Sequence, residues 1–118
     1  MLDIKQYEVQ EFYTNLKGKA PHILLKESQQ SPVVLALLAN WSGASHILDL
    51  YMKEIALEMR ECAQFYKVDA NLNKKMIKSW GIVQFPSTLI LKKGKKVGII
   101  EGLKSKKKIK TQIEFFIS

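Results

Sequence analysis

The alternation of apolar and polar positions is clearest from Ser31 to the end of the chain. Residues 32–39, PVVLALLA, form a continuous apolar run that opens with proline, which is typical of a strand buried on both faces. Beyond it, apolar residues at helical spacing predict helices, and short apolar runs between turn residues predict strands. The predicted elements are a helix over 45–60, a strand over 62–70, a helix over 72–80 closed by Gly81, two strands joined at Gly94, and a last helix capped by Ser105.

This order of elements predicts the fold class. Strand–helix–strand connections imply parallel neighbours, whereas the short turn at Gly94 implies an antiparallel pair. The sequence therefore predicts an α/β fold with a central mixed β-sheet and helices on both faces.

The first 30 residues are less regular. Asp3 followed by Gln6 resembles a capping box, and apolar residues at helical spacing then predict a helix over 3–17. The alternation at Tyr7 and Val9 leaves an edge strand as the alternative, and residues 21–29 predict a short helix opened by Pro21. No linker divides the chain, so we expect a single domain in which residues 1–30 precede a core over 31–118.

Length and composition limit the kind of protein. A chain of 118 residues can form one hydrophobic core without disulfides, and its single cysteine cannot form an internal disulfide. No apolar run is long enough for a membrane span, and the polar N-terminus does not resemble a signal peptide. We therefore expect a cytoplasmic protein.

The net charge of +8 comes from one segment. Residues 92–110 contain nine lysines and one acid, Glu101, which accounts for the whole surplus. Such a cluster can bind an anionic surface or nucleic acid, but it can equally be a solvated lysine surface. Base recognition favours arginine, and Arg60 is the only one, so the composition argues against nucleic acid.

Several short motifs follow one another between residues 31 and 117. They are PVVLALLA followed by Asn40-Trp41-Ser42-Gly43-Ala44-Ser45, VDAN at 68–71, Trp80-Gly81-Ile82 leading to Phe85-Pro86-Ser87-Thr88, a Lys-Gly-Lys turn, and Gly102 before the last helix. In this order and spacing the chain resembles the thioredoxin family, and the resemblance implies a thioredoxin-like fold.

The chain departs from that family at its reactive motif. Active members carry Trp-Cys-Gly-Pro-Cys where a strand leads into a helix N-terminus, which stabilises a thiolate. Here Ser42 and Ser45 replace the two cysteines, and Ala44 replaces the proline. The buried acid of active members, its lysine partner and a later helix proline correspond to Ala36, Phe65 and Leu50. Because this supporting apparatus is missing as well, the pattern favours a natural member without dithiol chemistry over a laboratory mutant.

The resemblance also implies a binding groove. The proline matching Pro86 is cis in the family, and the backbone beside it, here at Phe85, pairs with an extended substrate segment. Trp41, Gly43, Phe85 and Gly102 would border this groove. We therefore expect a non-catalytic module that binds a protein or an extended peptide, with Ser42, Gly43, Ala44 and Ser45 as a degenerate motif.

Two alternatives stay open. One is a thiol-disulfide oxidoreductase by family descent, which could act at most through Cys62, although a lone cysteine is more often a small core residue. The other is a protein that binds an anionic surface or nucleic acid through residues 92–110, in which the lysines nearest the predicted groove are Lys104, Lys106, Lys107 and Lys108. His22 and His46 have no Cys, Asp or Glu at ligand spacing, so we expect surface histidines, no metal and no cofactor. Ser42 and His46 are four residues apart and could face each other, but a hydrolase would need a third group.

Overall fold

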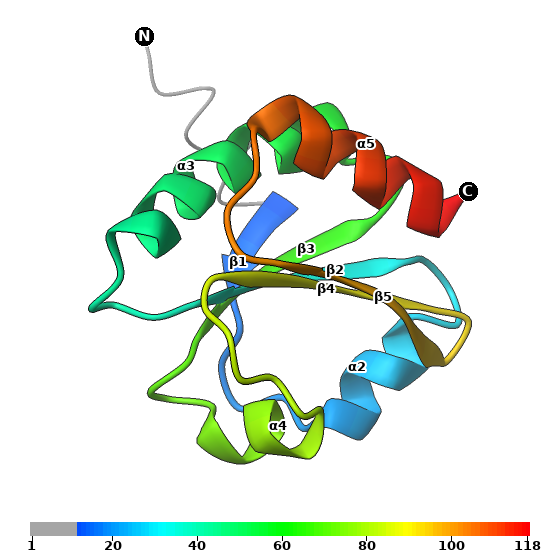
Figure 1. Ribbon diagram of the computed structural model, residues 1–118. Helices are drawn as coiled ribbons and strands as arrows, with labels where there is room; N and C mark the ends of the chain where they lie inside the picture. Colours follow the sequence, from blue (N-terminus) through cyan, green and yellow to red (C-terminus); the bar gives the residue numbers. More distant parts are fainter. Residues whose placement is uncertain (1–11) are drawn as a thin grey trace, which may run out of the picture.

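The computed structural model describes residues 12–118, which form a five-stranded sheet between two layers of helices (Figure 1). The elements in chain order are β1 (Tyr13–Asn15), α2 (Pro21–Glu27), β2 (Val33–Leu38), α3 (Gly43–Glu58), β3 (Gln64–Asp69), α4 (Lys74–Ser79), β4 (Ser87–Lys92), β5 (Lys95–Glu101) and α5 (Lys106–Ile117). Figure 1 shows α3 and α5 above the sheet and α2 and α4 below it.

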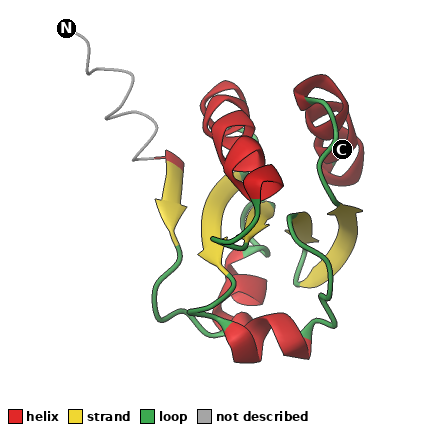
Figure 2. Ribbon diagram, turned by 60° about the vertical axis from the view of Figure 1, so that its left-hand side comes forward, coloured by secondary structure: helices red, strands yellow, loops and turns green. Residues whose placement is uncertain are grey.

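The strand order is β1-β3-β2-β4-β5. Strands β1 and β2 run parallel to β3, whereas β4 is antiparallel to β2 and to β5. Every residue of β2 is buried, because β2 is the central strand and helices cover both of its faces (Figure 2). The predicted α/β class, mixed sheet and two helical layers are confirmed.

Two apolar clusters lie on either side of this sheet. The cluster under α3 and α5 includes Leu48, Met52, Ile109 and Ile113, and the cluster over α2 and α4 includes Leu24 and Met76. At Gly98 a side chain would meet the Phe116 ring at 2.6 Å. Glycine at this position therefore allows α5 to pack closely against β5.

The predicted helix over 3–17 is wrong at Tyr13–Asn15, which form the edge strand β1. Parallel pairing with β3 supplies backbone hydrogen bonds there and overrides the helical spacing. The predicted capping box and the alternation at Tyr7 and Val9 lie outside the described residues.

The helix predicted from residue 45 begins two residues earlier, at Gly43. The reason is local, because Ser42 Oγ accepts a hydrogen bond from the Ser45 N–H at 3.1 Å and so forms the N-cap. Ser105 caps α5 in the same way, as predicted, by accepting from the Lys108 N–H.

Candidate functional site

The loops after β2, before β4 and after β5 meet at the end of the sheet where β2 leads into α3 (Figure 1). The antiparallel register places Leu37 opposite Ser87 and Ser87 opposite Glu101. The end of β2, the start of β4 and the end of β5 are therefore neighbours. The fold thus brings the predicted residues Trp41, Pro86 and Gly102 to one end of the molecule.

The loop before β4 has a cis peptide bond between Phe85 and Pro86. Its position is held by the next strand, since the Gly102 N–H donates to the Pro86 carbonyl at 2.8 Å. Gly102 has a φ of +79°, a conformation that glycine adopts without strain.

The hydroxyls of both motif serines form hydrogen bonds with nearby backbone N–H groups. Ser42 Oγ accepts from the Ser45 N–H, and Ser45 Oγ accepts from the Ala39 N–H at 3.0 Å. Ser45 is only 2% exposed, and within residues 12–118 neither hydroxyl is hydrogen-bonded to His46. These hydroxyls therefore stabilise the turn into α3, and no base is in place to make either one a nucleophile.

A shallow groove of about 380 Å³ lies beside this turn, on the α4 side of the sheet. Its lining is mostly apolar and comprises Trp41, Ala70, Asn71, Lys74, Ile77, Lys78, Gly81, Ile82, Val83 and Phe85. Trp41 is 72% exposed and Val83 86% exposed, and the two side chains lie together in this lining. Of the predicted groove residues, Trp41 and Phe85 line this groove, whereas Gly43, Pro86 and Gly102 lie at the same end outside its lining.

Behind the motif, the positions of the family's acid and lysine are apolar. Ala36 and Phe65 are both buried in the core cluster under α3. Thr88, which is opposite Ala36 in the register, is buried with no hydrogen-bond partner for its hydroxyl. Neither Ala36 nor Phe65 has a group that could exchange a proton with the motif.

An acid and a lysine occur nearby, on different positions. Asp49 of α3 binds Lys67 of β3 at 3.0 Å and accepts a hydrogen bond from Tyr13 of β1 at 2.7 Å. Lys67 is two residues beyond Phe65, and therefore on the same face of β3. Burial, followed by the charge of Asp49, raises the pKa of Tyr13 well above its ordinary value. Tyr13 is thus a permanent hydrogen-bond donor, and the three residues tie β1 to α3.

This group was not predicted from the sequence. The available signal was a charged residue inside an apolar stretch, namely Asp49 between Leu48 and Leu50 and Lys67 between Tyr66 and Val68. A cavity of about 240 Å³ beside it is lined by Ser45, His46, Asp49 and Lys67, among others.

Comparison with known proteins agrees with this geometry. The family model described as thioredoxin matches residues 8–115. The chain belongs to the thioredoxin family. It is 26% identical over 92 residues to a thioredoxin of Listeria monocytogenes, covering 78% of this chain and 89% of that protein. It is also 29% identical over 79 residues to the bifunctional thioredoxin reductase/thioredoxin of Mycobacterium leprae, covering 67% of this chain but only 17% of that longer protein.

The structural comparison gives the same family. A chain in the solved complex of ferredoxin:thioredoxin reductase and thioredoxin f2 is 28% identical, with a TM-score of 0.79. The match covers 90% of this chain and 96% of that one. Proteins of the thioredoxin fold thus bind protein partners. This chain has Ser42 and Ser45 at the two positions where its resemblance to the family predicts cysteines.

Of the four lysines predicted to lie near the groove, Lys104 and Lys106 have partners within this thioredoxin-family fold. Lys106 binds Glu54 at 2.7 Å and Glu58 at 3.3 Å, and Lys110 binds Glu58 at 3.0 Å. Hydrogen bonds from Lys110 and Lys106 hold the pKa of Glu58 below its ordinary value. Lys104 donates to the Glu101 carbonyl at 3.0 Å, while Lys107 and Lys108 are exposed. Part of this cluster therefore fastens α5 to α3.

The remaining candidates lie away from the groove. Cys62 was expected to be a small core residue, but this prediction is wrong, because Cys62 is exposed. It lies in the turn after α3, and β3 begins only at Gln64, so no strand buries it. His22 and His46 are exposed, as predicted.

No helix within residues 12–118 has the length and apolarity needed to traverse a bilayer.

Proposed function

We propose that this thioredoxin-family protein lacks dithiol chemistry and binds an extended segment of a protein partner in the groove beside Trp41. One observation carries the proposal. Both motif hydroxyls are used in backbone hydrogen bonds, while Trp41 and Val83 remain mostly exposed at the groove. A serine cannot form a disulfide. Covering exposed apolar side chains with a partner lowers the free energy, so these residues favour binding.

The form of the partner follows from the neighbouring loop. Phe85 lines the groove and precedes Pro86, at the position where family members pair with an extended substrate by strand-like hydrogen bonds. A chain similar to this one is named in a complex with a protein, ferredoxin:thioredoxin reductase. These points support a polypeptide ligand; the cytoplasmic location stays a prediction.

Redox activity through Cys62 has less support. Cys62 follows the end of α3, whereas Ser42 lies at the beginning of that 16-residue helix. A helix of that length extends about 24 Å. Any disulfide exchange at Cys62 would therefore take place far from the groove.

The first experiment measures insulin reduction with dithiothreitol as the electron source. The natural chain should not exceed the rate in buffer, because it has no dithiol. The Ser42→Cys/Ser45→Cys double variant serves as the matched control and should gain activity, since the helix N-terminus at this position favours a thiolate. Turnover by the natural chain above the buffer rate would contradict the proposal, and its loss in Cys62→Ser would assign that activity to the single cysteine.

The second experiment tests the groove by capture of partners from native lysate. Trp41→Ala should lose the captured protein, whereas Phe115→Ala should retain it. Phe115 is a good control because it is 74% exposed, close to the 72% of Trp41, but belongs to α5. Equal capture by both variants would remove the groove from the proposal.

A further inference from the structure

The charge of the groove is one-sided. Its lining contains two lysines, Lys74 and Lys78, and no Asp or Glu. Both lysines are on α4 and both are exposed. Residues four apart on a helix have Cβ atoms about 6 Å apart on the same face. Lys74 and Lys78 therefore border one side of the groove together.

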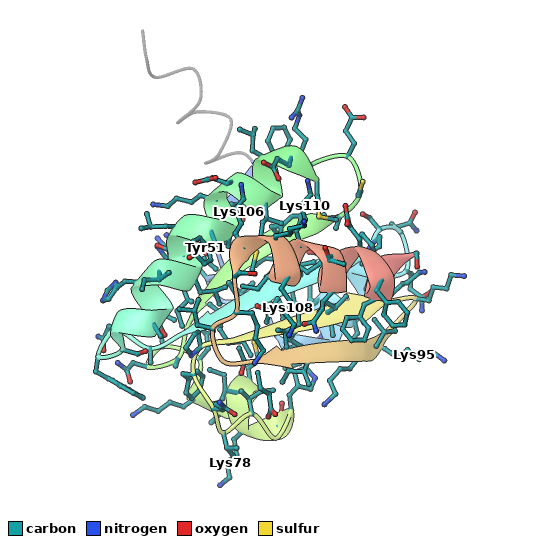
Figure 3. All side chains as sticks on the ribbon, turned by 45° about the horizontal axis from the view of Figure 1, so that its top comes forward. Tyr51, Lys78, Lys95, Lys106, Lys108 and Lys110 are labelled. Atoms are coloured by element: carbon teal, nitrogen blue, oxygen red, sulfur yellow. The ribbon has the colours of Figure 1, made fainter. Side chains whose placement is uncertain are left out.

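Unlike Lys106 and Lys110, these two lysines have no acid beside them among the described residues. Within residues 12–118 no Asp or Glu forms an ion pair with Lys74 or Lys78, whereas Lys106 and Lys110 bind Glu54 and Glu58. Figure 3 shows Lys106 and Lys110 near the boundary between α3 and α5, with Lys78 projecting from the opposite side of the molecule. Lys95 lies at the far hairpin.

The apolar lining and the two unpaired lysines together indicate which kind of partner segment would fit the groove. Trp41, Ile82 and Val83 offer an apolar surface to a large side chain, while Lys74 and Lys78 remain available to carboxylates on one side of it. Like charges four apart on a helix repel each other, so a carboxylate between them relieves an unfavourable interaction as well as making an attractive one.

We propose that the partner segment is acidic: an extended peptide with a large apolar residue in the groove and Asp or Glu beside it, paired with Lys74 and Lys78. This inference rests on the proposed function and adds the chemistry of the partner to it. It assigns the recognition of acidic side chains to the lysines of α4. The lysines predicted from the sequence to lie near the groove, Lys104, Lys106, Lys107 and Lys108, do not have this role.

The test is binding to an array of synthetic extended peptides with a constant Val-Ile-Val centre. The flanking positions are pairs of glutamate, glutamine or lysine. The natural chain should prefer the glutamate flanks, and its binding should weaken as salt is raised. The Lys74→Glu/Lys78→Glu variant should bind the glutamate peptide about tenfold more weakly, because each exposed ion pair contributes up to about fivefold, and should bind the lysine peptide better.

Two double variants with the same change in net charge serve as controls. Lys95→Glu/Lys96→Glu at the far hairpin and Lys107→Glu/Lys108→Glu on α5 should each change the affinity by less than about twofold, since charges beyond a Debye length are largely screened. An equal loss in all three variants would show a general charge effect and would overturn the role of α4.

Failure of this inference can be distinguished from failure of the proposed function. If peptides bind in a Trp41-dependent manner without preference for glutamate, the groove stands and the acidic partner is excluded. If no peptide binds the natural chain better than Trp41→Ala, the groove itself is excluded, and the acidic partner with it.

Discussion

The side of the sheet under α3 and α5 and the groove beside α4 use their polar groups in opposite ways. Under α3 and α5, Asp49 is bonded to Lys67 and Tyr13, and Glu54 and Glu58 are bonded to lysines of α5. Beside α4, Lys74 and Lys78 face an apolar groove that contains no acid. Polar groups that satisfy one another stabilise the fold, whereas unpaired groups around exposed apolar residues remain available to a partner. Substitutions on the first side should therefore affect folding, and substitutions on the second should affect binding.

The largest expected effect is that of Asp49→Ala. Removing this carboxylate leaves the buried Tyr13 hydroxyl without its acceptor and Lys67 without its counter-charge. We expect a loss of about 2–3 kcal/mol in the free energy of unfolding, measured by urea denaturation. Peptide binding by the folded fraction should not change.

Tyr13→Phe is the matched control for that variant. It removes the donor together with the need for an acceptor, so it should cost only about 1 kcal/mol. Equal losses in the two variants would mean that Asp49 contributes nothing beyond the tyrosine hydrogen bond.

Ser42→Ala should have an intermediate effect. The serine hydroxyl caps α3, and loss of such a cap costs about 1 kcal/mol of stability. Ser42→Asp keeps an acceptor at the same position and should retain the stability. If Ser42→Ala leaves the urea midpoint unchanged, the motif serine is not structural, and a chemical role for it must be considered again.

Trp41→Ala should change stability by no more than about 0.5 kcal/mol, because most of this side chain is exposed and its removal leaves no large cavity. The same variant should lose partner binding. A destabilisation comparable to that of Asp49→Ala would indicate that Trp41 is a packing residue and would weaken the contrast between the two sides.

The smallest expected effect is that of Glu58→Gln, at about 0.5 kcal/mol or less, because the ion pairs of Glu58 are exposed. The direction in which this stabilisation changes with pH follows from the pKa of Glu58. Since Lys110 and Lys106 lower the pKa of folded Glu58, the stabilisation is present above the unfolded value of about 4.3 and is lost as pH falls through the folded value. Thermal unfolding should therefore separate Glu58→Gln from the natural chain at pH 7 and not at pH 2.

Much of the fold could be predicted from local patterns. The apolar run at 32–39 predicted the central strand, and Ser105 predicted the start of α5, because burial on both faces and helix capping both depend on residues close in the sequence. The motif order also placed Trp41 and Pro86 at one end of the sheet. The short strand β1 could not be predicted in this way, since its partner, β3, is about fifty residues away.

The candidate site likewise has features that follow from the sequence and features that depend on the tertiary structure. By itself the sequence determined that residues 42 and 45 are serines and that the charge surplus lies in residues 92–110. Its resemblance to the family predicted that Ala36 and Phe65 replace the family's acid and lysine. Only the tertiary structure decided which charges are neutralised: Asp49 meets Lys67 and Tyr13, Glu58 meets Lys110, and Lys74 and Lys78 meet no acid within residues 12–118. The physical reason is that an ion pair or hydrogen bond requires contact within a few ångströms. Such contacts between distant elements depend on how the strands are registered and how each helix packs on the sheet.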